Sequence, residues 1–569
     1  MSSFRRRWPT LLKYALVGVA ASVCFSGSAA AQDAKDQQIE ALTRRLEKLE
    51  QQNQKLMQLV DSIHQKQLVV PSGMSMPSTS SQPEDVKKVV EKILKDKEDT
   101  KKAEDEKKKK EAAEKGYEVG SDNKLSAKFD LAKGLRFESE NKDFQLHLGA
   151  QLQFDTVFWQ QPQYMKGPAP GGNLGIGNPG STGVGNLDDG MFMRRVRTRF
   201  DGTLYETYEF NAELALEPVN QVQFIEMWYG VKELPFLGTV RVGQHKVPMG
   251  LESYSSDKVL PMMERSSQFD AFWQEFMPGV YVTNTGLDQH MTWHFMFSKV
   301  ETFQPNDGAS FGDGEFAYTG RVTFLPWYEN EGRCLLHLGA SAQWRDSNIG
   351  RLSGLPGTST TGTGFVDTSK IVRFRDRPEL RDSVGSFLGT TSRFVDTGNI
   401  VADGVATTSL EMLMYAGPLW FQSEASLASV PDASYPATPA GTKRGTVNYW
   451  GAYFMAGYFL TGEHRGYDRR FGKFTGVVPN ENFFAIRDEE GRFNYGLGAW
   501  EVIYRYSFLD LNDQGINGGM LGEHTFGVNW HMTPTMKMQV NYLITDRNVP
   551  LPAQSGVVSG LGVRFHYDF

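Results

Sequence analysis

Residues 144–158 read FQLHLGAQLQFDTVF, and apolar and polar side chains alternate along nearly the whole stretch. Phe144, Leu146 and Leu148 fall on one face and Gln145 and His147 on the other, because successive side chains of a β-strand point to opposite sides. Most strands have only about 5–6 residues. The stretch therefore predicts an unusually long strand with one apolar face, longer than a soluble β-sandwich needs.

The same alternation continues to the last residue of the chain. Leu561, Val563, Phe565, Tyr567 and Phe569 share one face of the final segment, and polar residues occupy the other. A terminal amphipathic strand that ends in an aromatic residue resembles the C-terminal signal of bacterial outer-membrane barrels. In lipid every backbone polar group needs an internal partner, so a membrane-embedded sheet has to close on itself. We therefore expect an all-β, antiparallel transmembrane barrel.

Alternating segments of this kind number sixteen, which is even, as single-chain bacterial barrels require. Long outer loops and short periplasmic turns should alternate between them. Residues 461–495 depart from this rule, because the segment is long yet falls on the periplasmic side. Either the count is wrong by two or this segment folds into the lumen. The predicted strands are 143–159, 190–204, 208–217, 221–233, 238–246, 279–285, 290–299, 315–325, 334–345, 405–416, 418–428, 447–460, 496–509, 522–532, 535–545 and 556–569.

Composition excludes several other classes of protein. The chain has 569 residues, a net charge of −7 and a mean hydropathy of −0.42. The negative charge argues against a protein that binds nucleic acid through bulk positive charge. Beyond the N-terminus no apolar run is long enough to cross a bilayer as a helix, and two cysteines cannot build a disulfide scaffold.

The first 124 residues predict three segments ahead of the barrel. Residues 1–31 have the order of a secretory signal peptide, with cleavage near Ala30 or Ala31. Residues 32–70 place apolar side chains three and four apart, which predicts a coiled coil that associates with other copies. Residues 71–124 form a linker and a charged helical spacer, and residues 125–569 form the barrel.

Each of these N-terminal segments has an alternative interpretation. Residues 1–31 could be an uncleaved anchor, and the coiled coil could be an amphipathic helix packed on its own chain. The spacer could contact the cell wall through Lys107–Lys110. Export through the inner membrane places the barrel in the outer membrane and the coiled coil in the periplasm.

Several motifs, in order along the chain, resemble one known family. They are MRRVRTRF at 193–200, VGQHK at 242–246, RDRPE at 375–379 and GYFLTGE at 457–463. Together they resemble the phosphate-selective porin O/P family. The resemblance implies a homotrimeric, sixteen-stranded outer-membrane porin with an anion-preferring pore. It also implies that the long loop at 247–278 folds inward, which makes Lys258 and Arg265 candidates for the constriction.

The residues themselves predict a chemistry for the pore. Phe200 and Leu204 should face lipid, because a charge on a barrel's outer face costs ~2–4 kcal/mol at mid-membrane. Arg195, Arg197 and Arg199 then share the inner face at a spacing of ~6.6 Å. A guanidinium is always charged and its planar fork of donors suits phosphate and carboxylate. Other predicted inward cations are Arg241, Arg321, Arg345, Arg505, Lys537 and Arg564.

Acidic residues on the same inner faces offer a competing role for these arginines. Asp155, Glu213, Glu411 and Glu501 are examples, and they could pair with arginines simply to prevent repulsion. The sequence shows no metal cluster, and each apparent enzyme or cofactor motif is better explained as part of a loop or of the polar lumen lining. Two functions remain: a porin for passive diffusion of small anions, phosphate-like or other, or a structural barrel that tethers or spaces the envelope through its coiled coil with little transport.

Overall fold

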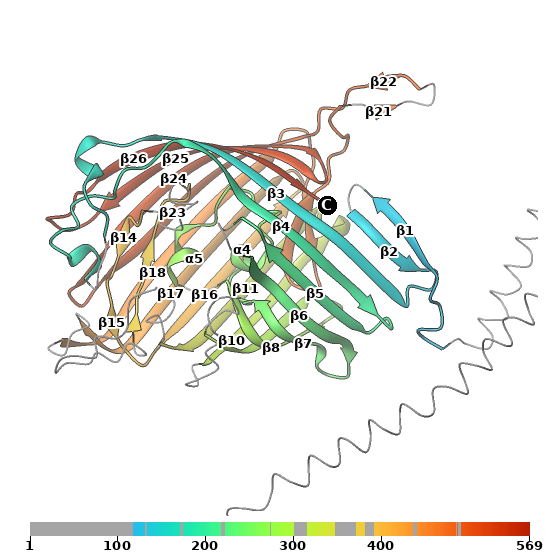
Figure 1. Ribbon diagram of the computed structural model, residues 1–569, viewed down its shortest axis with the longest axis horizontal. Helices are drawn as coiled ribbons and strands as arrows, with labels where there is room; N and C mark the ends of the chain where they lie inside the picture. Colours follow the sequence, from blue (N-terminus) through green and yellow to red (C-terminus); the bar gives the residue numbers. More distant parts are fainter. Residues whose placement is uncertain are drawn as a thin grey trace, which may run out of the picture. The chain divides into compact units, whose positions relative to one another are not determined.

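The structure is a computed structural model, and it describes residues 118–130, 134–170, 174–217, 222–272, 275–300, 316–347, 371–381, 392–435, 441–484, 486–487 and 491–569. In this part of the chain, sixteen antiparallel strands form a closed barrel (Figure 1). They are β3 (Phe144–Gln160), β4 (Gly190–Leu204), β5 (Tyr208–Ala215), β6 (Gln223–Leu234), β7 (Gly238–Lys246), β8 (Phe276–Gly286), β9 (Met291–Lys299), β10 (Phe316–Glu329), β11 (Cys334–Asp346), β16 (Gly404–Ala416), β17 (Leu419–Tyr435), β18 (Thr442–Phe459), β23 (Ala499–Asp513), β24 (Ile516–Thr533), β25 (Met536–Asn548) and β26 (Gly556–Asp568).

The predicted fold class and all sixteen predicted strands are confirmed. Each strand pairs with the next along the chain, and β26 closes the ring by pairing with β3 from Ser559↔Gln160 to Asp568↔Gln151. The last residue extends this seam, because Phe569 and Ala150 exchange two backbone hydrogen bonds of 3.1 Å. A ring of this kind leaves no edge with unpaired backbone groups, as lipid requires.

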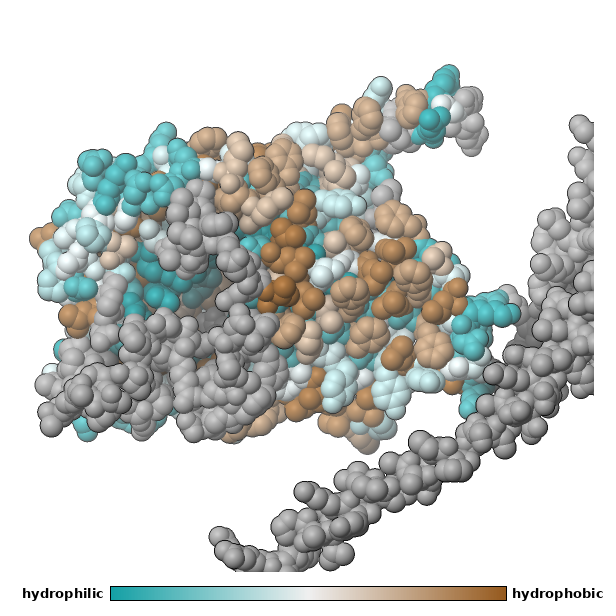
Figure 2. All heavy atoms as spheres, in the orientation of Figure 1, coloured by the Kyte–Doolittle hydropathy of each residue, from teal (hydrophilic) through white to brown (hydrophobic). Residues whose placement is uncertain are grey.

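The two faces of the wall differ as the alternation predicts. Outward side chains such as Leu410, Phe454 and Phe565 are apolar and exposed, and Figure 2 shows apolar residues gathered on the outer surface. Inward side chains such as Gln153, Glu411 and Arg505 are polar and buried against the segments that fill the lumen. Phe200 and Leu204 face outward with 42% of each exposed, as expected.

Shorter elements lie outside the ring. The hairpin β1 (Leu125–Asp130) and β2 (Gly134–Ser139) was not predicted as strands; it pairs with the first residues of β3, from Leu135↔Leu148 to Glu138↔Gln145. The remaining elements are η1 (Gln163–Lys166), η2 (Gly175–Gly177), α4 (Leu251–Tyr254), α5 (Ser267–Phe272), η3 (Asn330–Gly332), β12 (Ile371–Val372), β13 (Arg375–Asp376), β14 (Val395–Asp396), β15 (Ile400–Val401), β19 (Arg465–Asp468), β20 (Lys473–Val477), β21 (Ile486–Arg487) and β22 (Phe493–Asn494). No helix in the described part of the chain has the length and apolar character that a membrane crossing would need.

The long segment after β18 resolves the exception in the strand count. Its first part forms the hairpin β19–β20, whose tip lies inside the barrel: the Arg321 guanidinium on β10 donates to the backbone oxygens of Phe471 and Gly472 at 3.2 and 2.7 Å. Its second part, with β21 and β22, extends away from the ring (Figure 1). The strand count is therefore correct, and part of 461–495 folds into the lumen.

The predicted signal peptide, coiled coil and linker, and the spacer up to residue 117, lie outside the described residues. The domain boundaries proposed for residues 1–124 therefore remain predictions.

Candidate functional site

The inner face of β4 carries four arginines, one more than alternation predicts. The register between β3 and β4 shifts after Gln153↔Arg195, so that Phe154 pairs with Met193 and Arg194 is the extra residue of a β-bulge. Arg194 and Arg195 therefore both turn inward, followed by Arg197 and Arg199. A strict period of two would have placed the Arg194 guanidinium in lipid, at a cost of ~2–4 kcal/mol, and the bulge removes that cost.

Each guanidinium of this row contacts a carboxylate. Arg194 donates to both oxygens of Glu264 at 2.8 and 2.9 Å. Arg195 and Arg197 each lie 2.8 Å from Asp257. Arg197 also contacts Glu213 at 3.2 Å and Glu217 at 3.7 Å, and Arg199 contacts Asp201 at 2.9 Å. The row is thus held in a defined geometry, and two of its partners, Asp257 and Glu264, come from the loop between β7 and β8.

That loop keeps its own carboxylates ionised. Burial by itself would raise the pKa of Asp257, but Arg197 and Arg195 outweigh burial and hold this pKa well below its usual range. Burial likewise opposes ionisation of Glu264, and Arg194 is the main group that holds its pKa well below the ordinary value. The electrostatic attachment of the loop to β4 therefore persists well into acidic solution.

A second attachment holds the start of the loop against the opposite wall. The Glu424 carboxylate on β17 accepts hydrogen bonds from the backbone N–H groups of Leu251 and Glu252 at 2.7 and 2.8 Å. Gly250 turns the chain into this position with a φ of +66°, and a Cβ there would lie 2.6 Å from Glu424 Oε2. The chain therefore bends at Gly250 because only glycine fits this turn.

Predicted pore cations on β23, β25 and β26 fix the rest of the loop. Arg505, fully buried, contacts Glu252 of the loop at 3.1 Å and Glu379 of the segment between β11 and β16 at 2.5 Å. Arg564 contacts Glu264 at 2.8 Å. Lys537 donates to the backbone oxygen of Leu260 at 3.1 Å. These cations therefore anchor the segments inside the barrel.

The other predicted residues occupy varied surroundings. Lys258 lies 3.7 Å from Asp568, and Arg265 lies 2.9 Å from Glu275. Arg321 pairs with Glu411 at 2.8 Å and holds the tip of the hairpin β19–β20. Arg345 is 4% exposed, and its buried Nε has no hydrogen-bond partner among the described residues.

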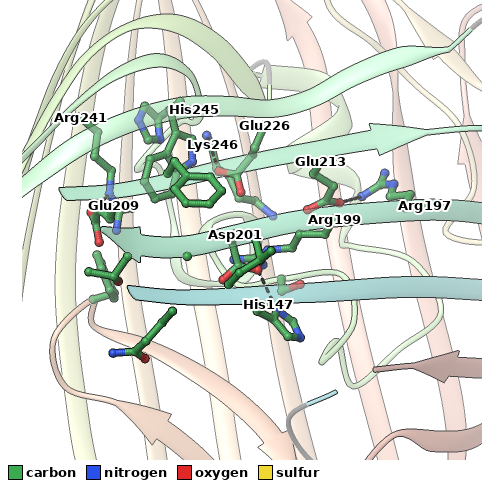
Figure 3. A pocket seen from close by; sticks show the side chains of 18 of the residues that line it. His147, Arg197, Arg199, Asp201, Glu209, Glu213, Glu226, Arg241, His245 and Lys246 are labelled. Carbon is green, nitrogen blue, oxygen red and sulfur yellow. Dashed lines mark hydrogen bonds and ion pairs between the residues drawn. The ribbon is translucent and has the colours of Figure 1, made fainter. Parts of the chain in front are cut away.

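A cavity with about 320 Å³ of space for water-sized molecules lies beside the arginine row. Figure 3 shows Arg197 and Arg199 of the row at this cavity, with Glu209, Glu226, Arg241 and His245 on the neighbouring strands. Arg241 pairs with Glu209 at 2.5 Å and its guanidinium lies 4.0 Å from the centre of the Trp228 ring. The tip of the hairpin β19–β20 contributes Phe471 and Lys473 to the lining.

A second cavity, of about 200 Å³, lies near the turn between β24 and β25. It brings together two predicted residues far apart in sequence, Lys258 and Lys537, with Arg465. Asp568 is the one carboxylate among the described residues that line it. Cations thus outnumber acids among the residues that line this cavity.

Sequence reasoning missed several cations that line or brace these cavities, among them Arg136 and Lys246. Arg194 was hidden by the bulge, although the cost of exposing its charge to lipid could have revealed it. Arg465 and Lys473 lie in residues 461–495, for which the sequence allowed two explanations: a strand count wrong by two, or a segment folded into the lumen. Their spacing in an arginine- and lysine-rich stretch at 465–473 was the available signal.

A closed sixteen-stranded barrel with an apolar outside and a charged lumen is the architecture of bacterial outer-membrane β-barrels. The chain belongs to the family "Phosphate-selective porin O and P", whose family model matches residues 178–569. The chain is therefore an outer-membrane porin, and this membership confirms the predicted family and the prediction that it is not an enzyme.

Individual proteins similar to the chain include the following three, each from a different bacterium. An uncharacterized protein of Caulobacter vibrioides is 27% identical over 397 residues, which cover 67% of this chain and 69% of that protein. Porin O of Pseudomonas aeruginosa is 24% identical over 440 residues, which cover 72% and 85%. The crystal structure of the outer membrane channel DcaP of Acinetobacter baumannii matches with a TM-score of 0.41 at 11% identity, over 76% of this chain and 99% of that one.

Proposed function

We propose that this porin mediates passive diffusion of small anions, phosphate-like or other, along the inner face of β4. The observation that carries the proposal is the inward row of Arg194, Arg195, Arg197 and Arg199. The described hydrogen bonds of Arg197 use Nη1 alone and its Nε lies 3.7 Å from Glu217, so the N–H groups on Nη2 remain for a solute. Successive forks let an anion engage one site as it leaves another, which keeps each binding step weak enough for flux.

The predicted inward cations divide into two groups in this proposal. The first group lines the two cavities or lies beside them and would contact the solute; its members are Arg195, Arg197, Arg199, Arg241, Lys258 and Lys537. Arg321, Arg505 and Arg564 are almost fully buried in ion pairs and would act by fixing the segments that narrow the lumen. Arg265 would support the loop through Glu275.

Reversal potentials in a KCl gradient across a planar bilayer test the proposal. We expect the wild type to prefer anions, and replacement of Arg195, Arg197 and Arg199 by Gln to lower the anion-to-cation permeability ratio by roughly three- to tenfold. Arg333→Gln, at an exposed turn, is the control for loss of a positive charge. Cation preference in the wild type would defeat the proposal. Heat-dependent mobility on gels shows whether the triple variant still folds, and the single variant Arg199→Gln should show the same trend.

We further infer that three copies associate in the membrane, in contact with outer-membrane lipid. Membership of the family supports this assembly, since the sequence resemblance implied a trimer. Native mass spectrometry of the detergent-solubilised porin should give three times the mass of the chain; a monomer at all concentrations would contradict it.

A further inference from the structure

The larger lumenal cavity, unlike the smaller one, is electrically balanced. Its described lining contains six cations and six carboxylates: Arg136, Arg197, Arg199, Arg241, Lys246 and Lys473 against Glu138, Asp201, Glu209, Glu213, Glu226 and Asp257. A cavity built simply to hold an inorganic anion would carry an excess of positive charge at this point. Equal numbers of both signs suit a solute that itself carries both.

Most of these charges already have an opposite charge within the protein. Arg199 pairs with Asp201, Arg241 with Glu209, and Lys246 with Glu275. Lys473 and Glu226 differ, because neither has an oppositely charged group within 4 Å among the described residues. Lys473 interacts electrostatically with Asp468, its neighbour across the hairpin β19–β20, and less strongly with Glu226, both across longer gaps.

The contacts that these two groups do make are weak ones. The Lys473 ammonium lies over the rings of Tyr254 and Phe471, at 5.4 and 5.3 Å from their centres. The Glu226 carboxylate accepts one hydrogen bond from the Asn211 amide and one from the backbone N–H of Lys246, both of 3.2 Å. Each therefore keeps hydrogen-bonding capacity for a third group placed between them.

An aromatic wall lies on the same cavity. The ring of His245 stacks on Trp228 with 5.0 Å between ring centres and lies 5.2 Å from that of Tyr281. Two nitrogen atoms of this wall, Trp228 Nε1 and His245 Nε2, are buried without a hydrogen-bond partner in the described structure, and His245 is only 2% exposed. Buried polar atoms are normally paired, so unpaired ones that line a cavity point to a ligand.

We infer that this cavity is a binding site for a small zwitterion with a flat apolar body, such as an aromatic α-amino acid. The ligand's carboxylate lies at Lys473, its ammonium at Glu226, and its ring against the wall formed by Trp228, His245 and Tyr281. A space of about 320 Å³ is within the range that holds small organic ligands. The inference needs the chain to be an open porin but does not need it to prefer anions.

The test measures how solutes reduce the single-channel current of the full-length porin in planar bilayers. Four probes share or lack the required groups: phenylalanine, 3-phenylpropionate without the ammonium, 2-phenylethylamine without the carboxylate, and inorganic phosphate. We expect phenylalanine to halve the current at a concentration about tenfold below that of each of the other three, because it alone can satisfy both charges. Equal block by phenylalanine and 3-phenylpropionate, or stronger block by phosphate, would overturn the inference and leave a plain anion site.

Two variants assign the two ends of the ligand. Lys473→Met should abolish the preference for phenylalanine over 2-phenylethylamine, and Glu226→Gln should abolish the preference over 3-phenylpropionate. Exchange of the charges, Lys473→Glu with Glu226→Lys, should restore the preference for phenylalanine. Lys443→Met, at the outer end of β18, is the matched control. The four solutes should reduce its current at the same concentrations as in the wild type.

Current without solute separates failure of folding from failure of the inference. A variant that still opens with wild-type conductance is folded, and unchanged preferences in both single variants would then exclude the site. The reversal potential of the same channels reports anion preference independently, so the function proposed above can fail while this site holds, or the reverse.

Discussion

Arg505 shows how single residues hold the interior of this barrel. Its guanidinium is fully buried and joins Glu252 of one inward segment to Glu379 of another. A buried pair of this kind contributes little compared with apolar packing, yet removal of one member leaves the other charge without a partner. The inward segments are therefore sensitive to this residue although it need not touch the solute.

Arg505→Gln should lower the free energy of unfolding by roughly 3–5 kcal/mol, because two buried carboxylates lose their cation. Urea unfolding in lipid vesicles, followed by tryptophan fluorescence, measures the change. Arg333→Gln is the control, since Arg333 donates to Gly462 from an exposed turn. An effect of Arg505→Gln no larger than that of the control would show that the ion pairs do not anchor the segments.

The outer face of one strand allows a matched test at two depths. Phe454 and Thr446 lie on the same face of β18, eight residues or ~26 Å apart along the strand. Phe454→Lys should destabilise the barrel by roughly 2–4 kcal/mol, because it places a charge in hydrocarbon. Thr446→Lys, near the outer end, should change stability by less than about 1 kcal/mol. Equal effects in the same unfolding assay would mean that this face is not exposed to lipid.

At the scale of elements, the hairpin β19–β20 folds into the lumen from the end that carries the short turns. Tyr467 accepts or donates a hydrogen bond of 2.7 Å to His337 on β11, and Arg470 donates one of 2.9 Å to Thr239 on β7. The hairpin thus crosses between walls on two sides of the barrel. It occupies space through which solute would otherwise pass.

Replacement of residues 466–476 by a short Gly-Ser linker should raise the single-channel conductance, on the order of twofold, because it removes an obstruction from a sixteen-stranded lumen. The comparison is a deletion of 486–494, which shortens β21–β22 outside the ring. That deletion should leave conductance unchanged. If both deletions behave alike, the hairpin does not limit flow.

At the scale of the whole molecule, the ring is complete between Phe144 and Phe569. Every barrel strand finds both neighbours within this range, and β26 pairs with β3. The described strands ahead of it, β1 and β2, lie outside the closed ring. Conduction and any role of the N-terminal segment in the envelope are therefore separable.

Deletion of residues 32–120 should leave single-channel conductance and ion preference unchanged, because the ring does not include them. Measured in cells, sensitivity to detergent and osmotic stress then reports on the alternative function. Greater sensitivity would support a tether through the coiled coil, and unchanged sensitivity would count against it. Loss of conduction would contradict the independence of the ring.

Alternation of side chains determined the barrel from the sequence alone. Phe144 to Phe158 and Leu561 to Phe569 carry a period of two, and lipid on one side forces that period to be strict, so all sixteen strands were predictable. The same rule correctly turned Arg195, Arg197 and Arg199 inward. It failed at Arg194, because this residue is the extra one in a β-bulge, which turns its side chain inward. The sequence pattern does not show where a bulge occurs.

Only the tertiary structure decided which lumenal charges are held in ion pairs with inward segments and which face a cavity. Arg505 and Arg241 look equivalent in sequence, yet one is locked between two inward segments and the other faces a cavity. Lys473 reaches Glu226's cavity only because a hairpin folds back into the barrel. Such contacts join residues hundreds of positions apart, and their geometry depends on how irregular loops pack inside a closed wall, for which a local sequence pattern carries no signal.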